Sequence, residues 1–225
     1  MKTIYNLGTI AIAAIIAFTT AGCHKSKREA PVTQQYQVDF ADSQAHVAAW
    51  FTIGSSSNYL QFTDRSLVTA NGIVDSGHSS TGTQYFGWSF LNTNEVVFVL
   101  NKNGSTLINK ASRSSVGDIT LVMDSVLSVN DTMRVSFTGS AIDANEYIGV
   151  AVNRNSDSTN QWSGISAQFT GTQCTLDFSQ TRLFYPGIYT VQVTRRRQLP
   201  LQQADGGGGG YISVSVTNAT TVTIK

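Results

Sequence analysis

From Pro31 onward, apolar side chains recur at every second position, which is the period of a β-strand. In the stretch 45–51, for example, Ala45, Val47, Ala49 and Phe51 alternate with more polar or second-face residues. The stretches 86–90, 119–123, 133–137, 147–152, 186–193 and 211–216 show the same alternation, and a short strand follows at 221–224. We find no convincing amphipathic helix, so the pattern predicts an all-β fold.

The spacing of these strands favours β-sandwiches over alternating strand–helix units. Strands recur about every 8–12 residues, and Gly, Asn, Asp and Ser separate them. Asn103-Gly104 favours a tight turn, so residues 95–111 are predicted to form a β-hairpin. A polar break at 112–117 interrupts the series. We therefore expect one sandwich over residues 33–115 and a second over residues 116–225.

The N-terminus resembles the signal peptide of a bacterial lipoprotein. Lys2 precedes a short apolar stretch at 7–18, and Thr20-Ala21-Gly22-Cys23 resembles a lipobox, in which small residues precede the lipidated cysteine. The resemblance implies a signal peptide at 1–22 and a lipidated Cys23 with a polar tether at 23–32. It places the protein at a bacterial membrane, expected to be the outer membrane, and leaves its periplasmic or surface face open.

The second half resembles bacterial immunoglobulin-like domains. Pro186-Gly187-Ile188-Tyr189-Thr190-Val191 is similar to the corner entering their strand F, where Tyr189 would form a tyrosine corner, and residues 129–139 resemble the turn into strand B. Short Asp-Ser/Thr-apolar triplets such as Asp124-Ser125-Val126 resemble the O-glycosylation acceptors of Bacteroidota exported proteins. The resemblance implies two tandem immunoglobulin-like sandwiches in a Bacteroidota-type lipoprotein, and it implies no activity.

Charge and composition argue against several functions. Without residues 1–22 the chain carries 14 Lys+Arg and 14 Asp+Glu, so it lacks the basic surface that nucleic-acid binding needs. The sequence has no HExxH, CxxC, GxSxG or P-loop pattern, and its histidines, His24, His46 and His78, are not grouped with potential catalytic partners. With Cys23 lipidated, Cys174 is left without a disulfide partner. We therefore expect a protein that is not an enzyme.

Two loops carry residues suited to ligand binding. Trp162 lies beside Asn160 and Gln161, and an aromatic ring among amides is typical of sugar recognition; an edge aromatic that covers the sandwich is the alternative. Tyr59, after a run of Ser and Asn, is a weaker case of the same kind. The only concentrated positive charge after the tether is Arg195, Arg196 and Arg197. We expect them in a mobile loop over 195–210, because five glycines at 206–210 have no side chain to pack. That loop is either a partner contact or a solvated strand end.

Calcium is the one cofactor that the sequence leaves open. Asp143 and Asp157 lie in stretches rich in oxygen-bearing side chains, which suit Ca²⁺, but neither matches the spacing of an EF-hand. We expect no other cofactor. The sequence as a whole favours a non-enzymatic envelope module that binds a glycan or a partner protein. The alternatives are a structural envelope subunit, such as a fimbrillin-like pilin or a complex accessory protein, and, less favoured, a hydrolase.

Overall fold

The computed structural model describes residues 31–53, 68–75, 78–80, 83–102, 104–129, 131–156, 161–164, 169–170, 173–176 and 185–225. Within residues 78–84 and 161–176 only the backbone of the strands is described. Pro31–Lys225 forms one compact unit. The predicted signal peptide and the lipidation site at Cys23 lie outside the described residues.

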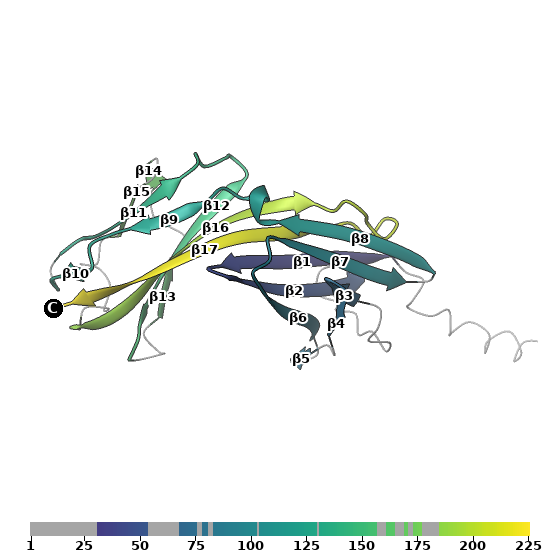
Figure 1. The fold of residues 1–225 in the computed structure, drawn as a ribbon, viewed down its shortest axis with the longest axis horizontal. Coiled ribbons are helices and arrows are strands. Elements are labelled where there is room, and N and C mark those ends of the chain that lie inside the picture. Colours follow the sequence, from purple (N-terminus) through teal and green to yellow (C-terminus); the bar gives the residue numbers. More distant parts are fainter. Residues whose placement is uncertain are drawn as a thin grey trace, which may run out of the picture. The chain divides into compact units, whose positions relative to one another are not determined.

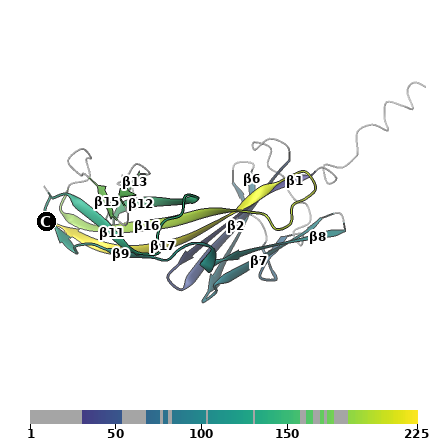
Figure 2. The same cartoon turned by 90° about the horizontal axis from the view of Figure 1, so that it is seen from above.

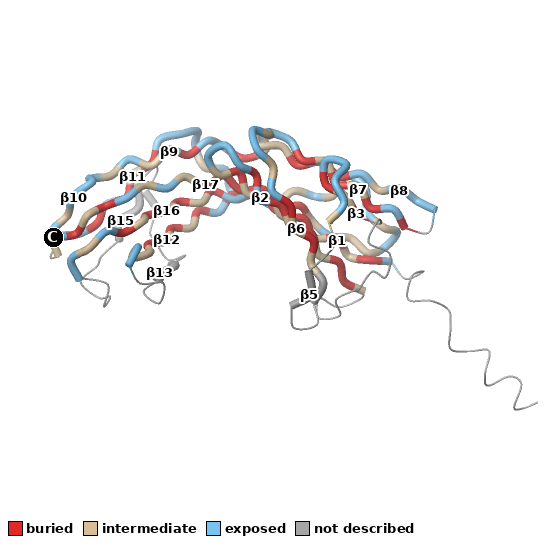
Figure 3. Tube along the Cα trace, turned by 60° about the horizontal axis from the view of Figure 1, so that its bottom comes forward, coloured by how far each residue is buried: buried red, intermediate tan, exposed pale blue. Residues whose placement is uncertain are grey.

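The described chain is built from β-strands and one short 3-10 turn, η2 (Arg113–Ser115), with no α-helix among the described residues (Figure 1). The strands form three sheets. Along them, buried and more exposed residues alternate, as Figure 3 shows. The prediction of an all-β sandwich fold is therefore confirmed.

One large sheet of nine strands organises the unit. Its order is β13 (Gln161–Gly164), β12 (Glu146–Arg154), β16 (Gly187–Pro200), β17 (Gly210–Ile224), β1 (Val32–Ala41), β2 (Gln44–Ile53), β6 (Thr83–Leu91) and β5 (His78–Ser80), and β10 (Val126–Leu127) also pairs with β17. All neighbours are antiparallel except β1 and β10, which run parallel to β17.

Two smaller sheets complete the fold. The first has the order β14 (Phe169–Thr170), β15 (Gln173–Leu176), β11 (Met133–Gly139) and β9 (Ile119–Val122). The second has the order β4 (Ile73–Val74), β3 (Val68–Ala70), β7 (Glu95–Lys102) and β8 (Ser105–Ser112). The β7–β8 pair is the hairpin predicted for residues 95–111, and Gly104 in its turn has the positive φ that such turns require.

The hairpin of β16 and β17 joins the two parts of the large sheet. The first part of β16, residues 189–197, pairs with β12, whereas residues 210–217 of β17 pair with β1 (Figure 2). The polar break predicted at 112–117 contains η2. The part of the large sheet that contains β12 and the part that contains β1 thus share one long hairpin. A domain boundary between residues 115 and 116 stays a prediction.

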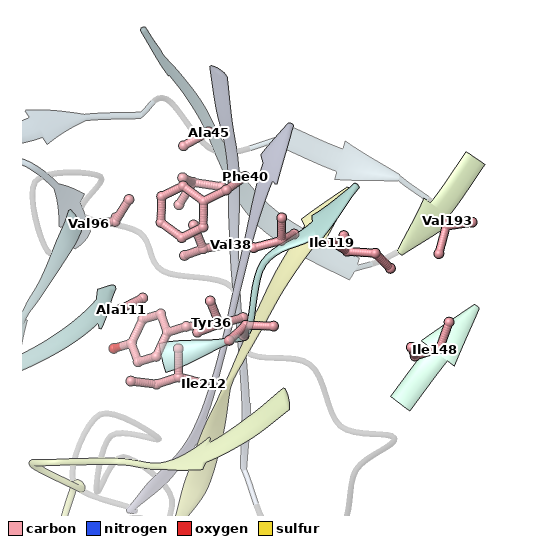
Figure 4. Close-up of a cluster of buried hydrophobic side chains, with 14 of the residues drawn as sticks. Tyr36, Val38, Phe40, Ala45, Val96, Ala111, Ile119, Ile148, Val193 and Ile212 are labelled. Atoms are coloured by element: carbon pink, nitrogen blue, oxygen red, sulfur yellow. The ribbon is translucent and has the colours of Figure 1, made fainter. Parts of the chain in front are cut away.

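Aromatic side chains show how the large sheet packs on the β7 sheet. Tyr36 of β1 stacks on Phe98 of β7 with ring centroids 4.3 Å apart, and it meets Phe51 edge to face. Burial raises the pKa of Tyr36, whose hydroxyl donates to Gln34 Oε1 over 2.8 Å. Figure 4 shows this core continuing toward Ile119 of β9 and Val193 of β16. Trp88 is also buried, as its apolar neighbours predict.

The tyrosine corner expected at Tyr189 is present. The Tyr189 side chain is buried, and its hydroxyl donates a hydrogen bond of 2.9 Å to the backbone carbonyl of Tyr185. This hydrogen bond ties the start of β16 to the segment that precedes it.

Candidate functional site

The outward face of the large sheet carries an open hollow over β1, β2 and β6. It has a volume of about 500 Å³ and is lined by Gln37, Asp39, His46, Val47, Ala48, Tyr85, Gly87, Trp88 and Ser89. Val47 and Trp88 turn their side chains into the core, so they contribute backbone to its floor. The other lining residues lie at the positions that alternate with the core.

The register of three strands explains why the sheet is hollow at this point. Ala48 of β2 lies opposite Gly87 of β6, so this row has almost no side chain on these two strands, and Gln37 continues it on β1. On one side of it lies the row of His46 and Ser89, and on the other the row of Trp50 and Tyr85. Small side chains between two rows of larger ones leave a depression, because neighbouring pairs on one face stand side by side.

Hydrogen bonds order the polar side of the hollow. Asp39 Oδ1 accepts from Ser215 Oγ over 3.0 Å and from Thr217 Oγ1 over 2.8 Å. His46 Nδ1 and Ser89 Oγ lie 3.3 Å apart in a third hydrogen bond. Hydroxyls of a neighbouring strand therefore hold the carboxylate in place, and all of these groups belong to strands paired within the large sheet.

The edge of the hollow at β6 is also fixed. The Gly87 backbone N–H donates to Asp75 Oδ2 over 2.8 Å, and Trp88 Nε1 donates to the Ile73 carbonyl over 3.0 Å. Both acceptors belong to β4 and the residue after it. These bonds give the Gly87 N–H and the Trp88 ring N–H acceptors at residues of β6 that no longer pair with β5.

Asp39, His46 and Ser89 lie in one register row, but they do not form a catalytic triad. Asp39 faces His46 across the β1–β2 pair, and His46 faces Ser89 across the β2–β6 pair. Among the described residues, however, the Asp39 carboxylate bonds to Ser215 and Thr217 and not to His46. A triad needs the carboxylate on the imidazole, so the arrangement offers hydrogen-bonding groups rather than an activated nucleophile.

The structure does not bring Gln161 or Trp162 of the predicted sugar-binding loop to this hollow. Gln161 and Trp162 belong to β13, where Trp162 pairs with Val152, and four strands of the sheet separate β13 from β2. Asn160 and Tyr59 lie outside the described residues, as do Asp157 and Cys23.

The expectation of a loop beginning at Arg195 is wrong, because residues up to Pro200 belong to β16. Strand alternation sends the three arginines to different surroundings. Arg195 points inward and is 1% exposed; Arg196 points outward and is exposed; Arg197 donates to Asp143 Oδ2 over 3.4 Å. Arg195 therefore has no surface to offer a ligand, contrary to the prediction.

Buried Arg195 is the centre of a polar network. Its Nε donates to Glu146 Oε2 over 3.0 Å, its Nη2 pairs with the same oxygen, and its other N–H groups reach the carbonyls of Asp118, Ser140 and Ala141. Burial raises the pKa of the Glu146 carboxyl, but hydrogen bonds from Arg195 and from the backbone N–H groups of Asp143 and Gly117 outweigh burial and hold it below its ordinary value.

The glycine run is packed rather than loose. A side chain at Gly208 or Gly210 would overlap the backbone of Val32 or Gln34. Thr33 Oγ1 donates to the Gly208 carbonyl over 2.7 Å, and the Gln34 N–H donates to the Gly209 carbonyl over 3.1 Å. A mobile loop was expected from these glycines; the structure instead shows Gly208 to Gly210 in close contact with β1, because their missing side chains let two backbones approach closely.

The structure adds little support for calcium binding at Asp143. The Asp143 carboxylate already accepts a hydrogen bond from Arg197. No group of three or more His, Cys, Asp or Glu side chains that could hold a metal ion occurs among the described residues.

Sequence reasoning missed the hollow, although part of its signal was present. His46 and Asp39 lie at outward positions of alternating strands, and Ala48 and Gly87 are unusually small for such positions. That Ala48 and Gly87 are neighbours depends on the pairing of β2 with β6, which the local pattern does not contain.

Within the described part of the chain, no helix is long and apolar enough to cross a membrane. Neither the models of known protein families nor the curated proteins searched give a match to this chain.

Proposed function

We propose that this protein is a lipid-anchored, non-enzymatic binding protein of the bacterial envelope and that the hollow over β1, β2 and β6 binds a carbohydrate. The observation that carries the proposal is the combination of Ala48 and Gly87 on the floor with Tyr85, Asp39 and His46 around them. A sugar offers hydroxyl groups and apolar C–H faces, and this site offers a carboxylate, an imidazole, an amide and an aromatic ring.

Hydrogen bonds within the protein already orient the side chains of the site, which favours ligand binding without a rearrangement of the protein. Asp39 is held by Ser215 and Thr217, and His46 by Ser89, so these groups are oriented before a ligand arrives. Preorganisation lowers the entropic cost of association. An open surface hollow also suits one part of a longer chain, because the ligand can continue on either side.

The anchor is supported by the sequence alone. The lipobox ends at Cys23, and β1 begins at Val32. A short tether would therefore connect the lipid to a strand inside the large sheet. We propose the outer membrane as its location, with no cofactor and no nucleic-acid partner.

A glycan array with the mature chain tests the sugar site. Gly87→Leu places a side chain in the hollow, and the space around the Gly87 Cβ position is open, with the nearest atom 3.9 Å away. Gly207→Leu is the matched control, since Gly207 lies between β16 and β17, outside the large sheet's strands, and has nothing within 4 Å of its Cβ position. We expect Gly87→Leu to lose a glycan signal that Gly207→Leu keeps. A wild-type protein that binds no glycan, or equal binding by the two variants, contradicts the sugar site.

A further inference from the structure

A single row of side chains on the face opposite the core continues from the hollow across the large sheet; its member on β17, Ser215, is buried, whereas the row is exposed at both ends. Ser89 faces His46, His46 faces Asp39, Asp39 faces Ser215, and Ser215 faces Arg196. Residues directly opposite each other in a pair point to the same face. The bonds of Ser215 to Asp39 and of His46 to Ser89 agree with this direction.

The row ends at Tyr147 of β12, which lies opposite Arg196. Tyr147 is 63% exposed, and Arg196 is exposed as well. The other two arginines of the run are engaged, Arg195 with Glu146 and Arg197 with Asp143. In the part of the chain that the structure describes, Arg196 makes neither a hydrogen bond nor an ion pair. Its guanidinium is thus the cation of this face that is available to a ligand.

We infer that Arg196 and Tyr147 form a second subsite of the proposed carbohydrate site and that the ligand is an acidic oligosaccharide whose carboxylate or sulfate lies on Arg196. This inference rests on the proposed function. A planar guanidinium binds such an anion through two parallel N–H bonds, and the exposed tyrosine ring offers a surface for a sugar face.

The charges along the row give the ligand a direction. Asp39 places a negative charge at the hollow, which disfavours an acidic group there, whereas Arg196 favours one at the other end. Two strand spacings, about 10 Å, separate Arg196 from Asp39. A single sugar ring does not reach both, so the inference requires an oligosaccharide with its acidic unit beyond the neutral unit in the hollow.

Calorimetric titration with paired oligosaccharides tests this inference. The probes are uronic-acid oligosaccharides with their methyl-esterified counterparts and sulfated oligosaccharides with their desulfated counterparts, each pair of equal length. We expect at least one acidic probe to bind at least about tenfold more tightly than its neutral counterpart, which corresponds to one charge-assisted contact. We expect Arg196→Gln to remove that difference and leave the neutral probe unaffected.

Arg134→Gln is the matched control, because Arg134 is an exposed arginine on β11, in a different sheet. It should keep the preference for the acidic probe, and urea unfolding of both variants shows that each is folded. An acidic preference that survives Arg196→Gln, or that both substitutions remove, overturns the inference. If acidic and neutral probes bind equally and Gly87→Leu abolishes both, the acidic subsite is wrong and the sugar site stands. If no probe of either kind binds, both proposals fall.

Discussion

Arg195 Nε donates a hydrogen bond of 3.0 Å to Glu146 Oε2, and both side chains are almost entirely buried. The pair connects β16 to β12, which are neighbours in the large sheet. Through its other N–H groups, Arg195 also holds the backbone at Asp118, just before β9, and at Ser140, just after β11, at one end of the antiparallel β9–β11 pair. One side chain thus joins two layers of the fold.

Replacing Glu146 by Gln should destabilise the protein strongly. The substitution keeps the shape but leaves the buried Arg195 guanidinium without its counter-charge, which costs about 3–5 kcal/mol in the free energy of unfolding. Urea unfolding measures this cost. The control is Glu95→Gln, which breaks an exposed pair with Lys110 and should cost no more than about 1 kcal/mol. Similar losses in the two variants would show that the buried pair has no special weight.

The same carboxylate should make stability depend on acid pH. Because the folded pKa of Glu146 lies below its ordinary value of 4.5, the unfolded state takes up a proton first as pH falls. The stabilisation that the ionised Glu146 carboxylate provides is complete above pH 4.5 and is lost as the pH drops from 4.5 through the folded pKa. We expect the difference in unfolding free energy between wild type and Glu146→Gln to narrow over this window. A difference that stays constant between about pH 7 and about pH 3 would contradict the assignment.

Gly210 should tolerate no side chain. It has a φ of +133°, and an added Cβ would overlap the Gln34 carbonyl oxygen. Gly210→Ala should therefore lower the midpoint of thermal unfolding. The strained backbone conformation alone should reduce the free energy of unfolding by about 1–3 kcal/mol. Gly207→Ala is the control, because nothing lies within 4 Å of its Cβ position, and it should be neutral or slightly stabilising. Equal midpoints for the two variants would contradict the close packing of this run on β1.

Lipidation at Cys23 is testable in a Gram-negative host. Metabolic labelling with radioactive palmitate should label the wild-type chain and drive it into the detergent phase on Triton X-114 partitioning. Cys23→Ser should abolish both, since the acceptor thiol is gone, and Cys174→Ser should change neither. Label retained in Cys23→Ser would remove the proposed anchor.

Removal of divalent metal should leave the fold unchanged. Asp143 is already engaged by Arg197, so we expect the thermal midpoint to be the same in EDTA and in excess calcium. A ligand that binds the folded state raises the midpoint. A calcium-dependent rise that Asp143→Asn or Asp157→Asn abolishes would therefore show a metal site after all.

The candidate site illustrates how far local pattern reaches. The alternation predicted over residues 86–90 agrees with the structure, in which Phe86 and Trp88 lie in the core and Gly87 and Ser89 on the opposite face. It could not show that Ala48 lies beside Gly87, because pairing between strands depends on contacts far apart in the chain. The chemistry of Gln161 and Trp162 suggested a sugar site, but β13 places these two residues at the other end of the sheet.

By itself, the sequence determined the strand content, the β7–β8 hairpin and the tyrosine corner at Tyr189, because each depends on residues close together in the chain. It is also the sole basis for the proposed anchor at Cys23. Tertiary structure decided which arginine is buried and which polar residues share a face. The burial of Arg195 depended on its pairing with Glu146, 49 positions away, and the hollow depended on the register of three strands. Both are consequences of long-range pairing, which the two-residue period of a strand leaves undetermined.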